Sequence, residues 1–272
     1  MLVTFACDND VMTLPDATAL AAAGLVLTLD GPVATVTLNK PDQRNSQTPT
    51  MWRTLAQIGA GLSDDIRIVV VKGEGKAFSA GLDRGIFTPE GLPGEQSIPV
   101  LMAAPDETIL AVIAEFQEAF AWLRDPRFVS IAAVQGYAIG GGFQLALSCD
   151  LRVAADDVQF SMKEPALGIV PDVGGTQPLV ECVGYSRAMD ICVTTRFVGA
   201  EESLAMGLVN RVVARADLEA ATQTLVEEIL GINAGAVRET KGLLQGAARV
   251  DAPAQRLRER QAQVRRFHDL RG

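Results

Sequence analysis

Short apolar runs divide the first part of the chain into strand-length and helix-length segments. Residues 25–30 and 33–38 alternate between apolar and polar positions around Gly31-Pro32, which predicts two strands joined as a hairpin. Residues 50–62 have helical spacing, and the β-branched run 66–71 that follows is typical of a strand buried in a parallel sheet. The succession of strand, helix and strand predicts βαβ units.

The pattern continues and then changes to helix. Residues 129–134 predict a buried strand, Gly140–Gly142 opens a helix that reaches Cys149, and residues 151–154 predict another short strand. After these, the segments with helical spacing are 188–193, 200–206, 217–230, 234–244 and 253–267. The sequence therefore predicts an α/β fold that ends in a helical region.

This pattern suggests three parts. We expect a variable lead-in over residues 1–24, an α/β core over 25–200 and a helical region over 201–272. Within the core, residues 85–105 are rich in Gly and Pro, so we expect a mobile loop there, ahead of a helix over 107–123. Such a loop can shape a pocket.

Charge and hydropathy exclude several classes of partner. The 272 residues carry a formal net charge of −9, which argues against a surface for nucleic acid or anionic membranes, because such a surface needs clustered Lys and Arg. No apolar run approaches the roughly 20 residues that span a bilayer. The N-terminus lacks a basic start followed by an apolar stretch, so we expect a cytoplasmic protein.

Histidine and cysteine usage narrows the chemistry further. The only histidine is His268, close to the C-terminus, so a histidine triad or a histidine metal cluster is not expected. The four cysteines show no CxxC spacing and are interpreted as free thiols. Catalysis would then depend on carboxylates, amides, hydroxyls or backbone groups.

The segment Gly136–Asp150 carries the strongest local signal. Its three consecutive glycines, Gly140–Gly142, lead into a helix, where backbone N–H groups can face a ligand at the positive end of the helix dipole. This arrangement is suited to an oxyanion hole. Taken alone, the same glycines fit tight packing equally well.

Several blocks together resemble the enoyl-CoA hydratase/isomerase (crotonase) superfamily in order and spacing. The similarity is clearest from about Leu25 to Val213 and looser in the C-terminal helices. The blocks are Leu38–Pro41 with Arg44-Asn45, Lys76–Asp83, Gly140–Gly142, Gly174–Gln177, Gly184–Met189 and Ala205–Asn210.

The resemblance implies a spiral of ββα turns with a C-terminal helical trimerisation region, assembled as a homotrimer or a dimer of trimers. It implies a coenzyme A thioester as substrate and no separate cofactor. The backbone N–H groups of Leu82 and Gly141 would form the oxyanion hole, with Ala80 near the adenine. Local positive charge for coenzyme A is expected from Arg44, Lys40 or Lys76, although each also fits a solvated surface residue.

The catalytic carboxylates differ from those of the family's hydratases, which place two glutamates around the substrate. Gln144 occupies the first position, where its amide can hold a water or a carbonyl but cannot accept a proton. The second position keeps its carboxylate as Glu164, the expected base. Asp172 matches an aspartate that some isomerases of the family carry, although an aspartate after proline is also common in turns.

These residues favour an enoyl-CoA isomerase that shifts a carbon–carbon double bond with Glu164 and Asp172. The alternatives are hydration of 2-enoyl-CoA, a lyase reaction, and a protein that binds acyl-CoA without turnover. Loss of the first glutamate is expected to impair hydration more, because hydration requires that water be deprotonated.

Overall fold

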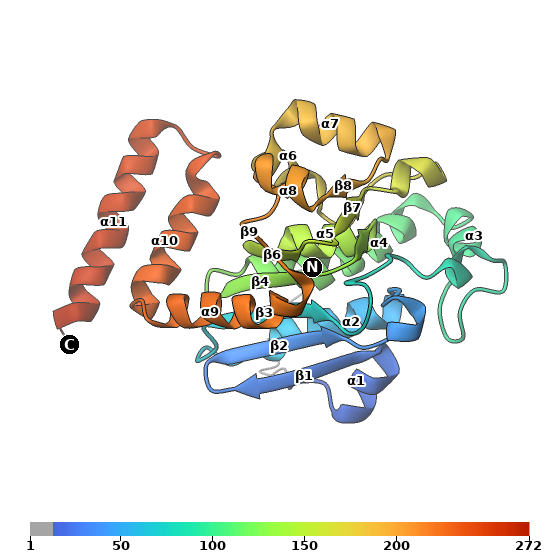
Figure 1. Cartoon of the computed structure of the whole chain (residues 1–272), viewed down its shortest axis with the longest axis horizontal. Coiled ribbons are helices and arrows are strands. Elements are labelled where there is room, and N and C mark those ends of the chain that lie inside the picture. Colours follow the sequence, from blue (N-terminus) through green and yellow to red (C-terminus); the bar gives the residue numbers. More distant parts are fainter. Residues whose placement is uncertain (1–12, 272) are drawn as a thin grey trace, which may run out of the picture.

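The computed structural model describes residues 13–271, in which two sheets carry the fold (Figure 1). The larger sheet has the strand order β1-β2-β3-β4-β6-β9, and only the β1–β2 pair is antiparallel. Its strands are β1 (Leu25–Asp30), β2 (Val33–Leu38), β3 (Ile68–Gly73), β4 (Val129–Val134), β6 (Leu151–Ala155) and β9 (Arg211–Val213). The smaller sheet consists of β5 (Tyr137–Ile139), β7 (Gln159–Ser161) and β8 (Val198–Gly199).

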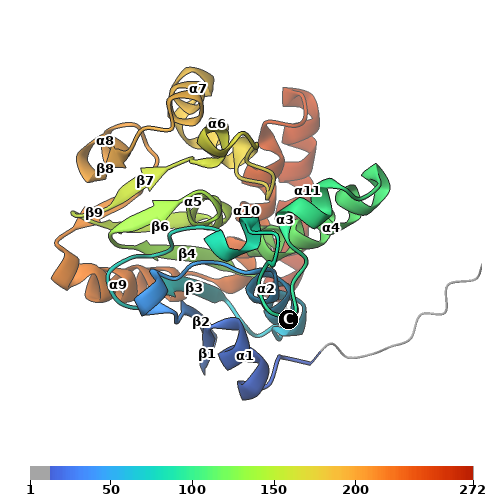
Figure 2. The ribbon, with the colours of Figure 1, turned by 90° about the vertical axis from the view of Figure 1, so that its right-hand side faces the viewer.

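Helices cover both faces of the larger sheet. Helix α2 (Pro49–Gly61) packs against both α1 (Ala17–Ala23) and α4 (Asp106–Ala121). Helix α9 (Leu218–Leu230) contacts β4 and β6. Figure 2 shows α5 (Gly141–Ser148) between the larger sheet and the smaller one. Above the smaller sheet in Figure 1 lie α6 (Thr176–Val183) and α7 (Tyr185–Thr194), and α8 (Ala200–Ala205) lies beside β8.

The core lies where α2 and α5 meet the larger sheet. All six residues of β4 are buried, as a strand between two helical layers requires. Leu55 and Ile58 of α2 and Phe143 of α5 are fully buried in the same cluster. Helix α2 begins at Pro49, and Thr48 caps it by accepting a hydrogen bond from the Met51 amide. The core therefore holds the start of α5 rigidly.

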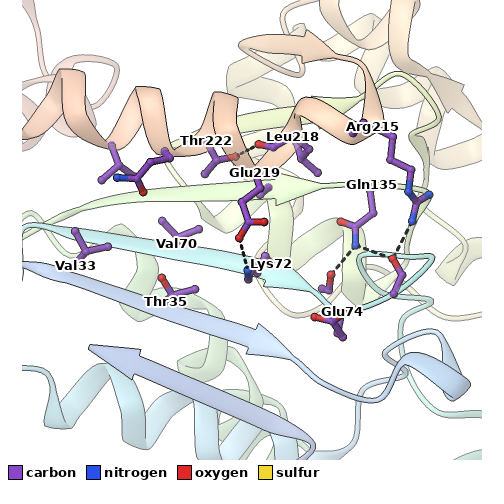
Figure 3. Close-up of a pocket in the computed structure, with 16 residues that line it drawn as sticks. Val33, Thr35, Val70, Lys72, Glu74, Gln135, Arg215, Leu218, Glu219 and Thr222 are labelled. Carbon is purple, nitrogen blue, oxygen red and sulfur yellow. Dashed lines mark hydrogen bonds and ion pairs between the residues drawn. The ribbon is translucent and has the colours of Figure 1, made fainter. Parts of the chain in front are cut away.

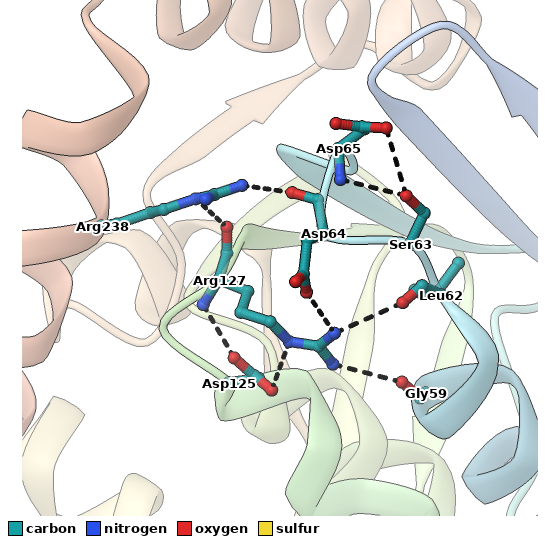
Figure 4. A network of polar contacts seen from close by, with 8 residues as sticks. All are labelled: Gly59, Leu62, Ser63, Asp64, Asp65, Asp125, Arg127 and Arg238. Carbon is teal, nitrogen blue, oxygen red and sulfur yellow. Dashed lines mark hydrogen bonds and ion pairs between the residues drawn. The ribbon is translucent and has the colours of Figure 1, made fainter. Parts of the chain in front are cut away.

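The C-terminal helices α10 (Ala234–Ala247) and α11 (Ala252–Arg271) form a hairpin at one side of the molecule (Figure 1). Arg238 of α10 donates to the carbonyls of Arg127 and Asp64, and the Arg127 guanidinium pairs with Asp64 and Asp125 (Figure 4). These contacts attach the hairpin to the body of the same chain. Among residues 13–271, no helix has the length and apolar character needed to cross a bilayer.

The predicted hairpin, the strands at 66–71, 129–134 and 151–154, and the helices of the C-terminal region are confirmed within a few residues. Of the lead-in predicted over residues 1–24, the first twelve lie outside the described residues. The segment 85–105 contains a short helix, α3 (Ile98–Met102), and the side chain of Glu95 ties this segment to α2. Glu95 accepts hydrogen bonds from the Thr50 amide at 2.6 Å and from Arg53 at 3.1 Å, so α2 holds this segment.

Candidate active site

The start of α5 provides one half of an anion-binding site. Gly140 has φ 53°, a left-handed value that favours glycine, and its N–H donates to Ser161 O at 2.9 Å. Gly141 is the first residue of α5, and N–H groups at this end of a helix have no intrahelical acceptor. The Gly141 N–H is therefore available to a ligand.

The loop that carries Leu82 lies directly against this helix start. Gly81 has φ 82°, and a Cβ added there would lie 2.4 Å from Ile139 O and 3.4 Å from Gly141 N. Only glycine permits this approach. Within residues 13–271, the Leu82 N–H also has no protein acceptor. The geometry thus brings two unpaired N–H groups, those of Leu82 and Gly141, to adjoining backbone segments.

Gln47 connects the two halves of this site, although the sequence did not indicate a role for it. Its N–H donates to Gly81 O and its carbonyl accepts from the Asp83 N–H, both at 2.8 Å. Its side-chain Oε1 accepts from Trp52 Nε1 at 2.9 Å, beside the Cα of Gly141. Because Gln47 is fully buried, it fixes the position of the Leu82 loop relative to α5.

Glu164 lies beside the same glycines. It follows β7 and is 7% exposed. A Cβ on Gly140 would lie 3.2 Å from Glu164 Oε1, so the carboxylate borders the helix start. Its Oε1 accepts from Gln144 Nε2 at 2.6 Å, and its Oε2 is buried without a hydrogen-bond partner among the described residues. Oε2 is therefore the atom free to take a proton.

Gln144 has a fixed orientation. Its Oε1 accepts hydrogen bonds from the Val173 N–H at 3.2 Å and the Gly175 N–H at 3.1 Å. A carbonyl between two N–H donors leaves the amide NH₂ to face Glu164. Gln144 thus positions the Glu164 carboxylate and has no basic atom to offer to water.

Asp172 lies close enough to Glu164 for the two carboxyls to interact. Burial raises the pKa of Glu164, and the negative charge of Asp172 raises this pKa further, whereas the bond from Gln144 opposes the shift. Burial also raises the pKa of the half-buried Asp172. The Asp172 carbonyl accepts from Gln117 Nε2 at 2.6 Å, which holds its loop against α4. The structure therefore brings Gln144, Glu164 and Asp172 together.

The residues expected to bind coenzyme A lie in adjacent loops. The Ala80 N–H donates to Arg44 O at 2.8 Å, and both Arg44 and Lys76 are exposed. Lys40 is half-buried, donates to Ser46 O at 3.2 Å, and has its pKa lowered by burial. Its ammonium thus contributes to the loop structure, while Arg44 and Lys76 remain accessible.

Another cavity, of about 330 Å³, lies on the opposite face of the larger sheet (Figure 3). It is bounded by β2, β3, β4 and α9, and Lys72 pairs with Glu219 at 3.3 Å along its wall. None of the predicted site residues lines this cavity. It is therefore separate from the candidate active site.

Comparisons with known proteins identify the family of this chain. The model of the Enoyl-CoA hydratase/isomerase family matches residues 29–271. A probable enoyl-CoA hydratase, echA8 of Mycobacterium tuberculosis, is 34% identical over 215 residues, which cover 78% of this chain and 77% of that protein. The mitochondrial Delta(3,5)-Delta(2,4)-dienoyl-CoA isomerase of Homo sapiens is 36% identical over 217 residues, covering 76% of this chain and 63% of that protein.

Solved structures extend the similarity to nearly the whole chain. The crystal structure of a putative enoyl-CoA hydratase from Thermobifida fusca YX in complex with CoA is 50% identical, with a TM-score of 0.90, and the match covers 95% of this chain and 98% of that one. The same protein in complex with acetoacetyl-CoA gives a TM-score of 0.91. The expected α/β fold is confirmed, and the chain is an enzyme of the enoyl-CoA hydratase/isomerase family.

Proposed function

We propose that this enzyme is an enoyl-CoA isomerase that converts a 3-enoyl-CoA thioester into its 2-enoyl isomer. The observation that carries the proposal is that both the oxygen and the NH₂ group of the Gln144 amide are already hydrogen-bonded within the protein. Its amide is held by two backbone N–H groups and donates to Glu164, so Glu164 and Asp172 are the acids left for proton transfer. An isomerase needs two proton positions and no activated water.

The Leu82 and Gly141 N–H groups would hold the thioester oxygen. Glu164 Oε2 would take a proton from C2, and the electron pair would move into a dienolate whose charge rests on that oxygen. Asp172, as a neutral acid, would then give a proton to C4, which leaves the double bond at C2. One oxyanion donor contributes about 3 kcal/mol to such a step.

The pKa directions support this division of roles. A buried carboxyl with a raised pKa is a stronger base once ionised, and a neighbour with a raised pKa can remain protonated as the acid. The two coupled carboxyls can therefore share one proton between them. Hydration of 2-enoyl-CoA is the alternative, in line with the names of several relatives, but it requires a base for water as well as an acid for the α carbon.

The ligand class rests on the Thermobifida fusca structures, which are complexes with CoA and with acetoacetyl-CoA. The exposed Arg44 and Lys76 and the backbone of Ala80 would bind the nucleotide end, as expected from the sequence. The human relative named as a dienoyl-CoA isomerase supports double-bond migration within the family.

The test is an assay of purified protein with 3-enoyl-, 2-enoyl- and dienoyl-CoA, following ultraviolet absorbance of the conjugated thioester. The proposal predicts conjugation of 3-enoyl-CoA by the wild type and its loss in Glu164→Gln, with acyl-CoA binding retained by calorimetry. Binding without conversion of any substrate would instead support a protein that binds acyl-CoA without turnover.

A further inference from the structure

A cavity of about 390 Å³ lies beside the loop that carries Asp172, between α4, α6 and α10 and the end of α5. Pockets of this size accommodate small organic ligands. Three hydrogen bonds connect its lining to the catalytic residues. Val173 N–H donates to Gln144 Oε1, Ser148 Oγ donates to Gln144 O at 2.9 Å, and Gln117 Nε2 donates to Asp172 O. The cavity therefore borders the residues that hold Gln144 and Asp172 in place.

The lining combines apolar and polar side chains. Phe120 and Val173 supply apolar surface, while Gln177 and Gln245 present amides. Two arginines, Arg124 and Arg249, also line the cavity, and among its described lining residues there is no carboxylate. An acyl chain that ends in a methyl group would offer these polar side chains no hydrogen-bond acceptor.

Arg249 is the cation that remains available. Arg124 pairs with Glu181 at 3.2 Å, and Gln177 donates to the same carboxylate at 2.8 Å. Within residues 13–271, Arg249 forms no ion pair. In a protein of net charge −9, a cation that lines a cavity free of acidic side chains creates a local site for an anion.

Helix α10 holds this part of the wall in place. Lys241 Nζ donates to Phe128 O and pairs with Asp150, each at 2.7 Å, and Gln245 Nε2 donates to Arg124 O at 2.6 Å. Arg249 lies just beyond the end of α10, in a turn where its N–H donates to Gly246 O at 3.0 Å, and it is exposed. It therefore lies at the outer edge of the wall that α10 forms.

We infer that the enzyme prefers acyl groups that end in a carboxylate, and that Arg249 binds this carboxylate. The inference rests on the proposed function, because the catalytic centre supplies the other end of the same substrate. Gln117 lines the cavity and donates to Asp172 O, so a ligand in the cavity would affect the position of the loop that carries Asp172.

The test compares binding of ω-carboxyacyl-CoA and acyl-CoA thioesters of equal length, such as adipyl-CoA and hexanoyl-CoA with their eight- and ten-carbon homologues. Wild type should bind the carboxylated member of at least one pair about tenfold more tightly. Arg249→Met should abolish this preference, and Arg249→Lys should retain part of it. Arg256→Met, at an exposed α11 position, is the matched control and should leave it unchanged.

Equal binding of both members of every pair by the wild type would overturn the inference, as would an unchanged preference in Arg249→Met. Turnover separates this result from the proposed function. Isomerisation of 3-hexenoyl-CoA without any carboxylate preference would refute the inference alone. A carboxylate preference that depends on Arg249, without isomerisation of 3-hexenoyl- or 3-hexenedioyl-CoA, would refute the proposed reaction alone.

Discussion

Gln144 Nε2 donates a hydrogen bond of 2.6 Å to Oε1 of Glu164, and Glu164 Oε2 remains buried without a partner among the described residues. One oxygen of the carboxylate is thus positioned and the other is left reactive. A buried acceptor without a donor costs free energy, and such groups occur at sites of function. This relationship leads to four predictions.

Glu164→Gln should lower the isomerisation rate constant by at least about a hundredfold, because the amide cannot take the proton from C2. It should also stabilise the protein at pH 7. Burial raises the folded-state pKa of Glu164, so its contribution to stability falls as pH rises from the unfolded value of about 4.3 through the folded value. Thermal denaturation at several pH values should show the variant's advantage shrinking toward acid pH. A lower melting temperature than wild type at pH 7 would contradict this argument.

Asp172→Asn should lower isomerisation by about a hundredfold while acyl-CoA binding is retained, because the proton carrier at C4 is lost. In the wild type, ionisation of Asp172 at high pH removes the acid and sets the basic limb of the pH profile. Any residual activity of the variant needs only ionised Glu164, so it should lack this basic limb. Wild-type activity in this variant would show that Asp172 carries no proton.

Gln144→Glu should impair the enzyme, although it introduces the residue type of the family's hydratases. A carboxylate held by the Val173 and Gly175 N–H groups would stay ionised and face Glu164, so the pKa of Glu164 would rise further. The acid limb of the pH profile should move to higher pH. Gln144→Met, which is similar in size and uncharged, is the control. It also removes the hydrogen bond that lowers the pKa of Glu164, so it should produce a smaller shift in the same direction than Gln144→Glu.

Gly81→Ala should lower the rate constant by about a hundredfold, because its Cβ would clash with Ile139 O and move the Leu82 N–H away from the Gly141 N–H. Gly94→Ala is a matched control. Gly94 has a similar φ of 77°, but nothing lies within 4 Å of an added Cβ. Both variants carry the same backbone strain, so comparable losses of activity in the two would argue against a specific role for the Gly81 contact.

The sequence predicted the parts of the fold where patterning is strong. The continuous apolar run 129–134 and the alternation at 25–30 and 33–38 correspond to β4, β1 and β2, because burial of one or both faces dictates those patterns. The two- and three-residue strands β5, β7, β8 and β9 escaped prediction, since so few residues show no periodicity. They depend on pairing with distant segments.

The candidate site, too, could be predicted from the sequence only in part. Glu164, Gln144 and the glycines could be identified from family-like blocks, and the structure brings them together. Gln47 could not, because its role depends on being fully buried between Gly81 and Gly141. Arg249 could not be identified either, because only the structure places this exposed residue at the edge of a cavity.

The most direct test of the proposed isomerase is incubation of the wild-type enzyme with 3-hexenoyl-CoA in water enriched in oxygen-18, followed by mass spectrometry of the thioester. The account predicts 2-hexenoyl-CoA of unchanged mass and without the heavy oxygen in its acyl chain. A product that has gained one molecule of labelled water, as a 3-hydroxyacyl-CoA, would show that the enzyme hydrates its substrate and would contradict the role assigned to Gln144.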